Sequence, residues 1–127
     1  MKILVVDDMP LMRHVMINML RRLEYEDITE ATDGRQAIQL LKNHHYDLLI
    51  TDLNMPKMSG KELIDKIRQE LKLVDLAIVV VTCDDNKQTV LNLITAKIDG
   101  MIVKPFTLNT LLKQLQYVSS RRDKQPQ

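Results

Sequence analysis

The sequence feature that most constrains the fold is an alternation of short apolar runs with longer amphipathic segments. The expected strands occupy residues 3–6, 28–31, 48–50, 76–81 and 101–103, and all but the second are continuous apolar runs. Such runs indicate strands that are covered on both faces, and the intervening segments have the three-to-four-residue spacing of helices. The alternation predicts an α/β fold, a doubly wound five-stranded parallel sheet with five helices.

Polarity suggests where two of these strands lie in the sheet. Residues 28–31 (ITEA) are the most polar and are expected at an edge, whereas residues 76–81 (LAIVVV) are the most apolar and are expected at the centre. For the first helix, Pro10 suits the first turn. Its predicted buried stripe is Leu11, Val15, Met19 and Leu23.

Side chains that can cap helix N-termini mark where the other four helices begin. The expected caps are Asp33, Ser59, either Asp84 or Asp85, and Thr107. Ser59 and Glu62 match the capping box S-x-x-E, in which each side chain satisfies the other residue's backbone N–H. The helix after residue 84 is expected to run to about Ala96. We expect one domain over residues 1–120 and a polar tail over residues 121–127.

Bulk composition excludes several classes of protein. The formal net charge of +1 argues against a domain-wide basic surface, so no direct nucleic acid binding is expected. The longest apolar run, residues 76–81, is far shorter than the roughly 18 residues that a membrane helix needs. The single cysteine excludes an internal disulfide framework. We therefore expect a cytoplasmic protein that does not insert into membranes.

Polar residues follow four of the five predicted strands. They are Asp7 and Asp8, then Asp52, then Thr82, and then Lys104. The carboxyl ends of parallel strands meet at one edge of a sheet, where ligands of such folds bind. Three crowded carboxylates repel one another unless a cation joins them, and oxygen-only ligands favour Mg²⁺. A cation, an ammonium and a hydroxyl together suit a phosphoryl group, which a central carboxylate can accept as nucleophile.

Four segments carry a resemblance to a known family. They are the acidic pair in LVVDD (residues 4–8), the acid in DLLITDLNMP (47–56), the threonine in IVVVTCDD (78–85) and the lysine in GMIVKPF (100–106). On these motifs the chain resembles the response-regulator receiver domains of two-component signalling, over roughly residues 1–120, and is similar to the single-domain chemotaxis regulators among them. The resemblance implies the flavodoxin-like receiver fold with strand order 2-1-3-4-5.

The same resemblance implies a role for each acid. Asp52 would be the phosphoacceptor. Asp8 and Asp52 would bind Mg²⁺ directly, together with the backbone carbonyl of Asn54, and Asp7 would act mostly through water.

The resemblance also implies how the phosphoryl group is held and where it comes from. Thr82 would donate its hydroxyl to one phosphoryl oxygen and Lys104 would pair with another. The peptide bond before Pro105 would be cis. The donor would be a phosphohistidine on a sensor histidine kinase or a phosphotransfer protein. The output would be a downstream protein target or a homodimer, formed through the helix that runs to about Ala96, the strand at residues 101–103 and the helix that follows Thr107.

One position departs from the family. Receivers usually have Tyr or Phe three residues before the lysine, and this chain has Met101. A flexible thioether can fill the same space but has no hydroxyl, so we expect an altered switch or a methionine that only packs. Val90 and Ile94, on the helix expected to run to about Ala96, are candidates to join Met101 in an exposed output patch, or to be core residues.

Other functions remain as alternatives. The chain could be an intermediate carrier in a phosphorelay. An aspartyl-nucleophile phosphatase would need a second acid two residues after Asp52, and Asn54 stands there. A carrier of flavin mononucleotide would need a phosphate loop where Asp7 and Asp8 place negative charge. A protein that used this fold only to bind a partner would not need all five of the polar residues at the strand ends, and all five are present. We therefore expect a signalling protein and not an enzyme.

Overall fold

The computed structural model describes the backbone of residues 1–123 and the side chains of residues 1–121. The strands are β1 (Ile3–Val6), β2 (Ile28–Ala31), β3 (Leu48–Asp52), β4 (Ala77–Thr82) and β5 (Gly100–Val103). The helices are α1 (Pro10–Arg22), α2 (Gly34–Asn43), α3 (Gly60–Asp65), α4 (Lys87–Thr95) and α5 (Leu108–Asp123). The α3 helix continues directly into a π-helical turn, η1 (Lys66–Glu70).

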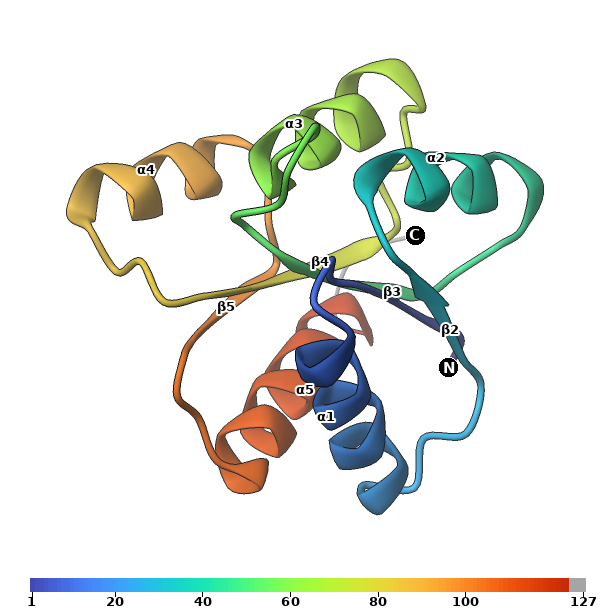
Figure 1. The fold of residues 1–127 in the computed structure, drawn as a ribbon, viewed down its shortest axis with the longest axis vertical. Helices are drawn as coiled ribbons and strands as arrows, with labels where there is room; N and C mark the ends of the chain where they lie inside the picture. Colours follow the sequence, from blue (N-terminus) through green and yellow to red (C-terminus); the bar gives the residue numbers. More distant parts are fainter. Residues whose placement is uncertain (124–127) are drawn as a thin grey trace.

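The five strands form one parallel sheet in the order β2-β1-β3-β4-β5, which confirms the expected fold (Figure 1). The polar strand β2 lies at an edge, as predicted. The apolar strand β4 is an interior strand, as expected, and β3 is the middle strand of the five. Both are interior strands buried along their whole length, so hydrophobicity does not distinguish their positions.

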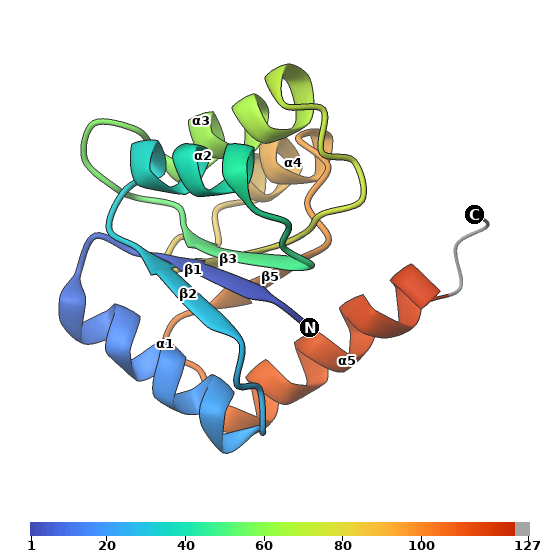
Figure 2. The ribbon, with the colours of Figure 1, turned by 90° about the vertical axis from the view of Figure 1, so that its right-hand side faces the viewer.

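The helices cover the two faces of the sheet as two layers. Helices α1 and α5 lie on one face, and α2, α3 and α4 lie on the other (Figures 1 and 2). Alternate residues of each strand serve opposite layers: Ile3 and Val5 pack with α1 and α5, while Leu4 and Val6 pack with the other helices. This double coverage explains why the strands are continuous apolar runs.

The buried face of α1 differs from the predicted stripe. Its buried residues are Arg13, Met16, Ile17 and Leu20, whereas Leu11 is 72% exposed. Met19 and Leu23 of the predicted stripe are partly buried and pack against the core, but Leu11 and Val15 are exposed. Apolar residues occur all around this helix, so the periodicity does not select one face. Residues 13, 16, 17 and 20 have regular helical spacing, but an arginine occupies the first position.

Most of the predicted caps are present. Asp33 accepts a hydrogen bond from the Gln36 N–H, and Thr107 accepts one from the Thr110 N–H. Ser59 accepts from the Glu62 N–H at 3.1 Å, but the Glu62 carboxylate accepts from the Ser59 hydroxyl at 3.4 Å and not in the predicted reciprocal way.

The α4 helix begins and ends differently from the prediction. Its cap is Asn86, which accepts from the Gln88 N–H. The predicted caps Asp84 and Asp85 lie before it, and the helix ends at Thr95. The α5 helix continues to Asp123, three residues into the predicted polar tail. The rest of that tail, residues 124–127, lies outside the described residues.

Several residues just after helical segments have left-handed backbone conformations without being glycine. Glu24 follows α1 with φ 72°, Lys72 follows η1 with φ 55°, and Lys97 follows α4 with φ 67°. Glycine is the usual residue at such positions because a Cβ atom is unfavourable there. The residues at these helix ends therefore lower the free energy of unfolding, compared with glycine at the same positions.

Replacing Glu24 or Lys72 with glycine is expected to stabilise the protein by about 0.5–1 kcal/mol per site, since the relief of left-handed strain exceeds the added freedom of the unfolded chain. The measurement is urea unfolding. The matched control is Gln39→Gly, at an exposed position within α2, which should destabilise by about 1 kcal/mol. A loss of stability in Glu24→Gly and Lys72→Gly would contradict the assignment of strain.

Candidate functional site

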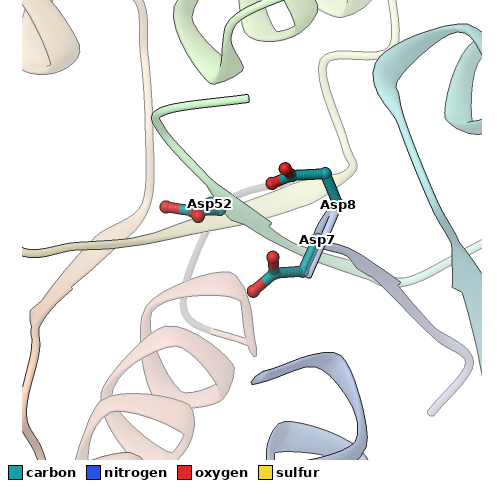
Figure 3. Close-up of side chains that lie close together, drawn as sticks. All are labelled: Asp7, Asp8 and Asp52. Atoms are coloured by element: carbon teal, nitrogen blue, oxygen red, sulfur yellow. The ribbon is translucent and has the colours of Figure 1, made fainter. Parts of the chain in front are cut away.

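Three carboxylates lie together at the carboxyl edge of the sheet. Asp7 and Asp8 follow β1 and Asp52 ends β3 (Figure 3). One carboxylate oxygen from each lies within 4.8 Å of the others. Parallel pairing causes this convergence, because Val6 is in register with Thr51 and the next residue of each strand is an acid. Asp7 is 8% exposed and Asp52 is 9% exposed.

The Asp52 carboxylate is fixed by two neighbours. Its Oδ1 accepts a hydrogen bond from the Leu53 N–H at 2.8 Å, and its Oδ2 lies 3.5 Å from Lys104 Nζ. The loop after β3 returns close behind it, because the Gly60 N–H donates to the Leu53 carbonyl at 2.7 Å. A Cβ on Gly60 would collide with the Asp52 backbone carbonyl. Glycine at the start of α3 therefore allows the helix to approach the end of β3.

The pKa of Asp7 is raised above its ordinary value. Burial is the largest cause, and the neighbouring charges of Asp52 and Asp8 add to it. The Met9 N–H, which donates to the carboxylate at 2.9 Å, and the Lys104 ammonium act in the opposite direction. A hard cation bound by three carboxylate oxygens would relieve the same repulsion. The residues present therefore fit a Mg²⁺ site by charge and by ligand type.

Thr82 and Lys104 approach this edge from β4 and from the residue after β5. Thr82 is fully buried, and its hydroxyl accepts a hydrogen bond from the Asp84 N–H at 3.0 Å. The Lys104 N–H donates to the Thr82 carbonyl at 2.8 Å, which ties the two strand ends together. The Lys104–Pro105 peptide bond is cis, as expected. Lys104 thus directs its ammonium toward Asp52.

Asn54 lies in the β3–α3 loop and is exposed. The loop reverses sharply after it, at Lys57, where φ is 69° and the Met58 N–H donates to the Pro56 carbonyl at 2.7 Å. A hydrogen bond between residues two apart around a positive φ is a strained turn. The loop that carries Asn54 therefore contains a tight, strained turn at Lys57.

Arg13, which was not predicted from the sequence, holds the backbone of the site at Asp7. Its Nη1 donates to the Asp7 carbonyl at 2.8 Å, and its Nε pairs with Glu30 Oε1 at 2.7 Å. The guanidinium, with a side chain 8% exposed, joins the β1–α1 loop to β2. No sequence signal identified Arg13, because apolar residues surround α1 and its buried face is not recognisable from the sequence.

A cavity of about 420 Å³ opens next to the carboxylates. Apolar side chains of α1 and Phe106 line it, including Met12, Met16 and Met19, and Asp52 and Lys104 lie at its polar end. The cavity belongs to the same site, since both share these two charged residues.

The predicted output residues lie on the α4–β5–α5 side with unequal exposure. Ile94 is 61% exposed, whereas Val90 and Met101 are half-buried. Met101 packs against the core beneath α4. The structure adds three exposed apolar residues to this side, Leu91, Val103 and Tyr117. Of these, Val103 had a sequence signal, since it is two residues after Met101 and shares its face of β5.

Comparison with known proteins matches residues 3–116 to the model of the response regulator receiver domain. The chain belongs to the response regulator receiver family. Among the receiver relatives, a chemotaxis protein CheY homolog of Campylobacter jejuni is 44% identical over 93% of this chain and 92% of its own length. Chemotaxis protein CheY1 of Helicobacter pylori is 40% identical over 97% of this chain and 100% of its own.

Solved receiver structures agree with the fold. Chemotaxis protein CheY4 of Vibrio cholerae superposes with a TM-score of 0.85 at 32% identity, over 92% of this chain and 97% of that one. A CheY-like receiver domain protein of Methanospirillum hungatei, at 24% identity, has a TM-score of 0.86 over 97% of this chain and 96% of that one, which shows the shared fold. Within residues 1–123 of this receiver, no helix is long and apolar enough to cross a membrane.

Replacing Asp7 with asparagine is expected to stabilise the metal-free receiver at pH 7. The raised pKa means that stability falls as pH rises through the folded-state value, because ionised Asp7 is disfavoured in the fold. Asparagine removes the charge and keeps an acceptor for the Met9 N–H. We expect a melting temperature higher by about 3 °C, near 1 kcal/mol at this chain length.

The measurement is thermal unfolding in a metal chelator at pH 7 and at pH 3.5. The difference between wild type and Asp7→Asn should shrink at pH 3.5, below the ordinary carboxyl pKa of 3.8. Asp85→Asn, at an exposed position, is the control and should change little. An Asp7→Asn protein less stable than wild type at pH 7 would contradict the electrostatic explanation.

Proposed function

We propose that this receiver is a phosphorylation switch in which Asp52 accepts a phosphoryl group from a phosphohistidine on a sensor histidine kinase or a phosphotransfer protein. The observation that carries the proposal is the convergence of Asp7, Asp8 and Asp52 within 4.8 Å, with Lys104 Nζ 3.5 Å from Asp52. Buried acids that repel one another, such as Asp7 and Asp52, are costly to the fold, and a phosphoryl-transfer site accounts for their presence. Family membership supports the same role.

In the transfer step an Asp52 carboxylate oxygen attacks phosphorus, so that an O–P bond forms and the P–N bond to the donor imidazole breaks. The electron pair of the broken bond returns to the imidazole, whose other ring nitrogen carries a proton, so the donor leaves as neutral histidine. Lys104 then pairs with a phosphoryl oxygen, and the Thr82 hydroxyl donates to another. The backbone N–H of Leu53 holds the carboxylate in place during the attack.

Magnesium is the proposed cofactor. Asp8 and Asp52 would hold it directly, with the backbone carbonyl of Asn54, and Asp7 would contribute through water. The ion supplies positive charge that neutralises the phosphoryl oxygens during transfer. The family match and the carboxylate cluster support this assignment.

The proposed output is a change of the α4–β5–α5 side. Phosphorylation adds charge at Asp52, Thr82 moves toward it, and the region of Met101, Val90 and Ile94 is biased toward an arrangement that binds a downstream protein or a second copy of this receiver. Exposed apolar side chains on this side, such as Ile94 at 61%, are suited to a protein partner. The relatives' names support a target in chemotaxis.

The proposal places the protein in the cytoplasm, where its kinase would act. It also makes the chain a signalling protein and not an enzyme, because the group it transfers ends on its own side chain. No diffusible metabolite is converted.

Asp52→Asn is expected to abolish labelling by radioactive acetyl phosphate in the presence of Mg²⁺, by at least a hundredfold, because the amide is not a nucleophile. Wild type should label to a stoichiometry approaching one. Asp85→Asn makes the same chemical change at an exposed acid outside the cluster and should label like wild type. Equal labelling of wild type and Asp52→Asn, or none in either, would refute the proposal.

Magnesium is expected to stabilise wild type and so to raise its melting temperature. At a Mg²⁺ concentration ten times the dissociation constant, the free energy of unfolding should increase by about 1.4 kcal/mol. Asp8→Asn should remove this increase, because it deletes a proposed direct ligand. Sodium chloride at equal ionic strength controls for screening. An equal Mg²⁺ effect in Asp8→Asn would place the ion elsewhere.

A further inference from the structure

The α4 helix is held by hydrogen bonds at both ends and by little packing between them. Leu93 is the only buried residue of α4, all of whose residues the structure describes. Leu91 and Ile94 on the same helix are 48% and 61% exposed. The position of α4 therefore depends strongly on what holds its two ends.

The N-terminal end is connected to the phosphorylation site through Asp84. The Asp84 N–H donates to the Thr82 hydroxyl at 3.0 Å. The Asp84 carboxylate in turn accepts from the N–H of Asn86, the cap of α4, at 2.9 Å and from the hydroxyl of Thr89 at 3.0 Å. One residue thus joins the buried threonine of the site to the first turn of the helix.

The C-terminal end is held by Arg68, which projects from the π-helical turn η1. Its guanidinium donates to the Lys97 carbonyl at 3.0 and 3.2 Å and to the Leu73 carbonyl at 2.5 Å. It also pairs with Asp99 at 3.1 Å, with side chains only 8% and 19% exposed.

Asp99 extends this connection to β4, because its carboxylate accepts from the Ile78 N–H at 2.8 Å and its own N–H donates to the Ile78 carbonyl at 2.8 Å. Charge-assisted hydrogen bonds of this kind are stronger than neutral ones. The turn after α4 is therefore fastened to the rigid sheet.

We propose that α4 pivots about the Arg68–Asp99 pair when Thr82 moves, with Asp84 and Thr89 transmitting the movement to its N-terminal end. This inference rests on the proposed function. When the Thr82 hydroxyl turns toward a phosphoryl oxygen, its hydrogen bond from the Asp84 N–H changes, and Asn86 and Thr89 follow the Asp84 carboxylate. The C-terminal end stays with β4. Thr89 and Arg68 are positioning residues in this device and touch no reacting atom.

The test is beryllofluoride, as a phosphoryl mimic, added with Mg²⁺ and read by amide chemical shifts along α4. In wild type the shifts should be at least twofold larger at residues 87–90 than at residues 97–99. Thr89→Val removes the hydroxyl at nearly constant volume and should cut the shifts at residues 87–90 to less than half. Thr89→Ser keeps the hydroxyl and should respond like wild type.

Labelling by acetyl phosphate separates this inference from the proposed function. Thr89→Val should label within about twofold of wild type, whereas failure of wild type to label would refute the proposed function itself. If wild type and Thr89→Val both label and show the same shifts along α4, the connection through Thr89 is refuted.

The pivot is tested with Arg68→Lys, which keeps the charge but loses the forked geometry. The shifts at residues 97–99 should at least double on beryllofluoride binding. Asp99→Asn keeps an acceptor for the Ile78 N–H and weakens the ion pair, so it provides the same test if Arg68→Lys does not fold. Unchanged shifts at residues 97–99 in a folded variant would overturn the pivot.

Discussion

The mutual repulsion of three acids at one sheet edge is the constraint on which the rest of this structure depends. Asp7, Asp8 and Asp52 bring their oxygens within 4.8 Å, and burial with neighbouring charge raises the pKa of Asp7. The fold holds them there through parallel register, since the ends of β1 and β3 are side by side. Lys104 is the compensating cation, and its approach depends on the backbone connection between its N–H and Thr82.

The same edge of the sheet also links the site to the α4 helix. Thr82 is fully buried between strand partners, so it has little freedom except at its hydroxyl. That hydroxyl already takes part in a chain of hydrogen bonds that leads through Asp84 to α4. A small change at the site can therefore be expressed at a helix that has one buried residue and is fastened at its far end by Arg68.

The sequence predicted the residues that follow strands well, and helix faces less well. Asp52 and Lys104 were recognisable because strand ends of a parallel sheet share one edge, whatever the details of packing. The buried face of α1 was not recognisable, because its apolar residues surround the helix and Arg13 is buried through two polar partners, the Asp7 carbonyl and Glu30. The cap of α4 was also predicted wrongly: several residues in a row can cap a helix, and Asn86, two residues after Asp84, makes the capping hydrogen bond.

By itself the sequence determined the α/β class, the strand positions and the set of acids, hydroxyl and ammonium at the strand ends, because period and order along the chain are local properties. Tertiary structure alone decided that Ile94 is exposed while Met101 packs beneath α4, and that Arg68 reaches across to Lys97 and Asp99. These features depend on which surfaces meet in the fold. Arg68 is separated from Lys97 by 29 positions and from Asp99 by 31, and no periodic pattern in the sequence indicates contacts over such separations.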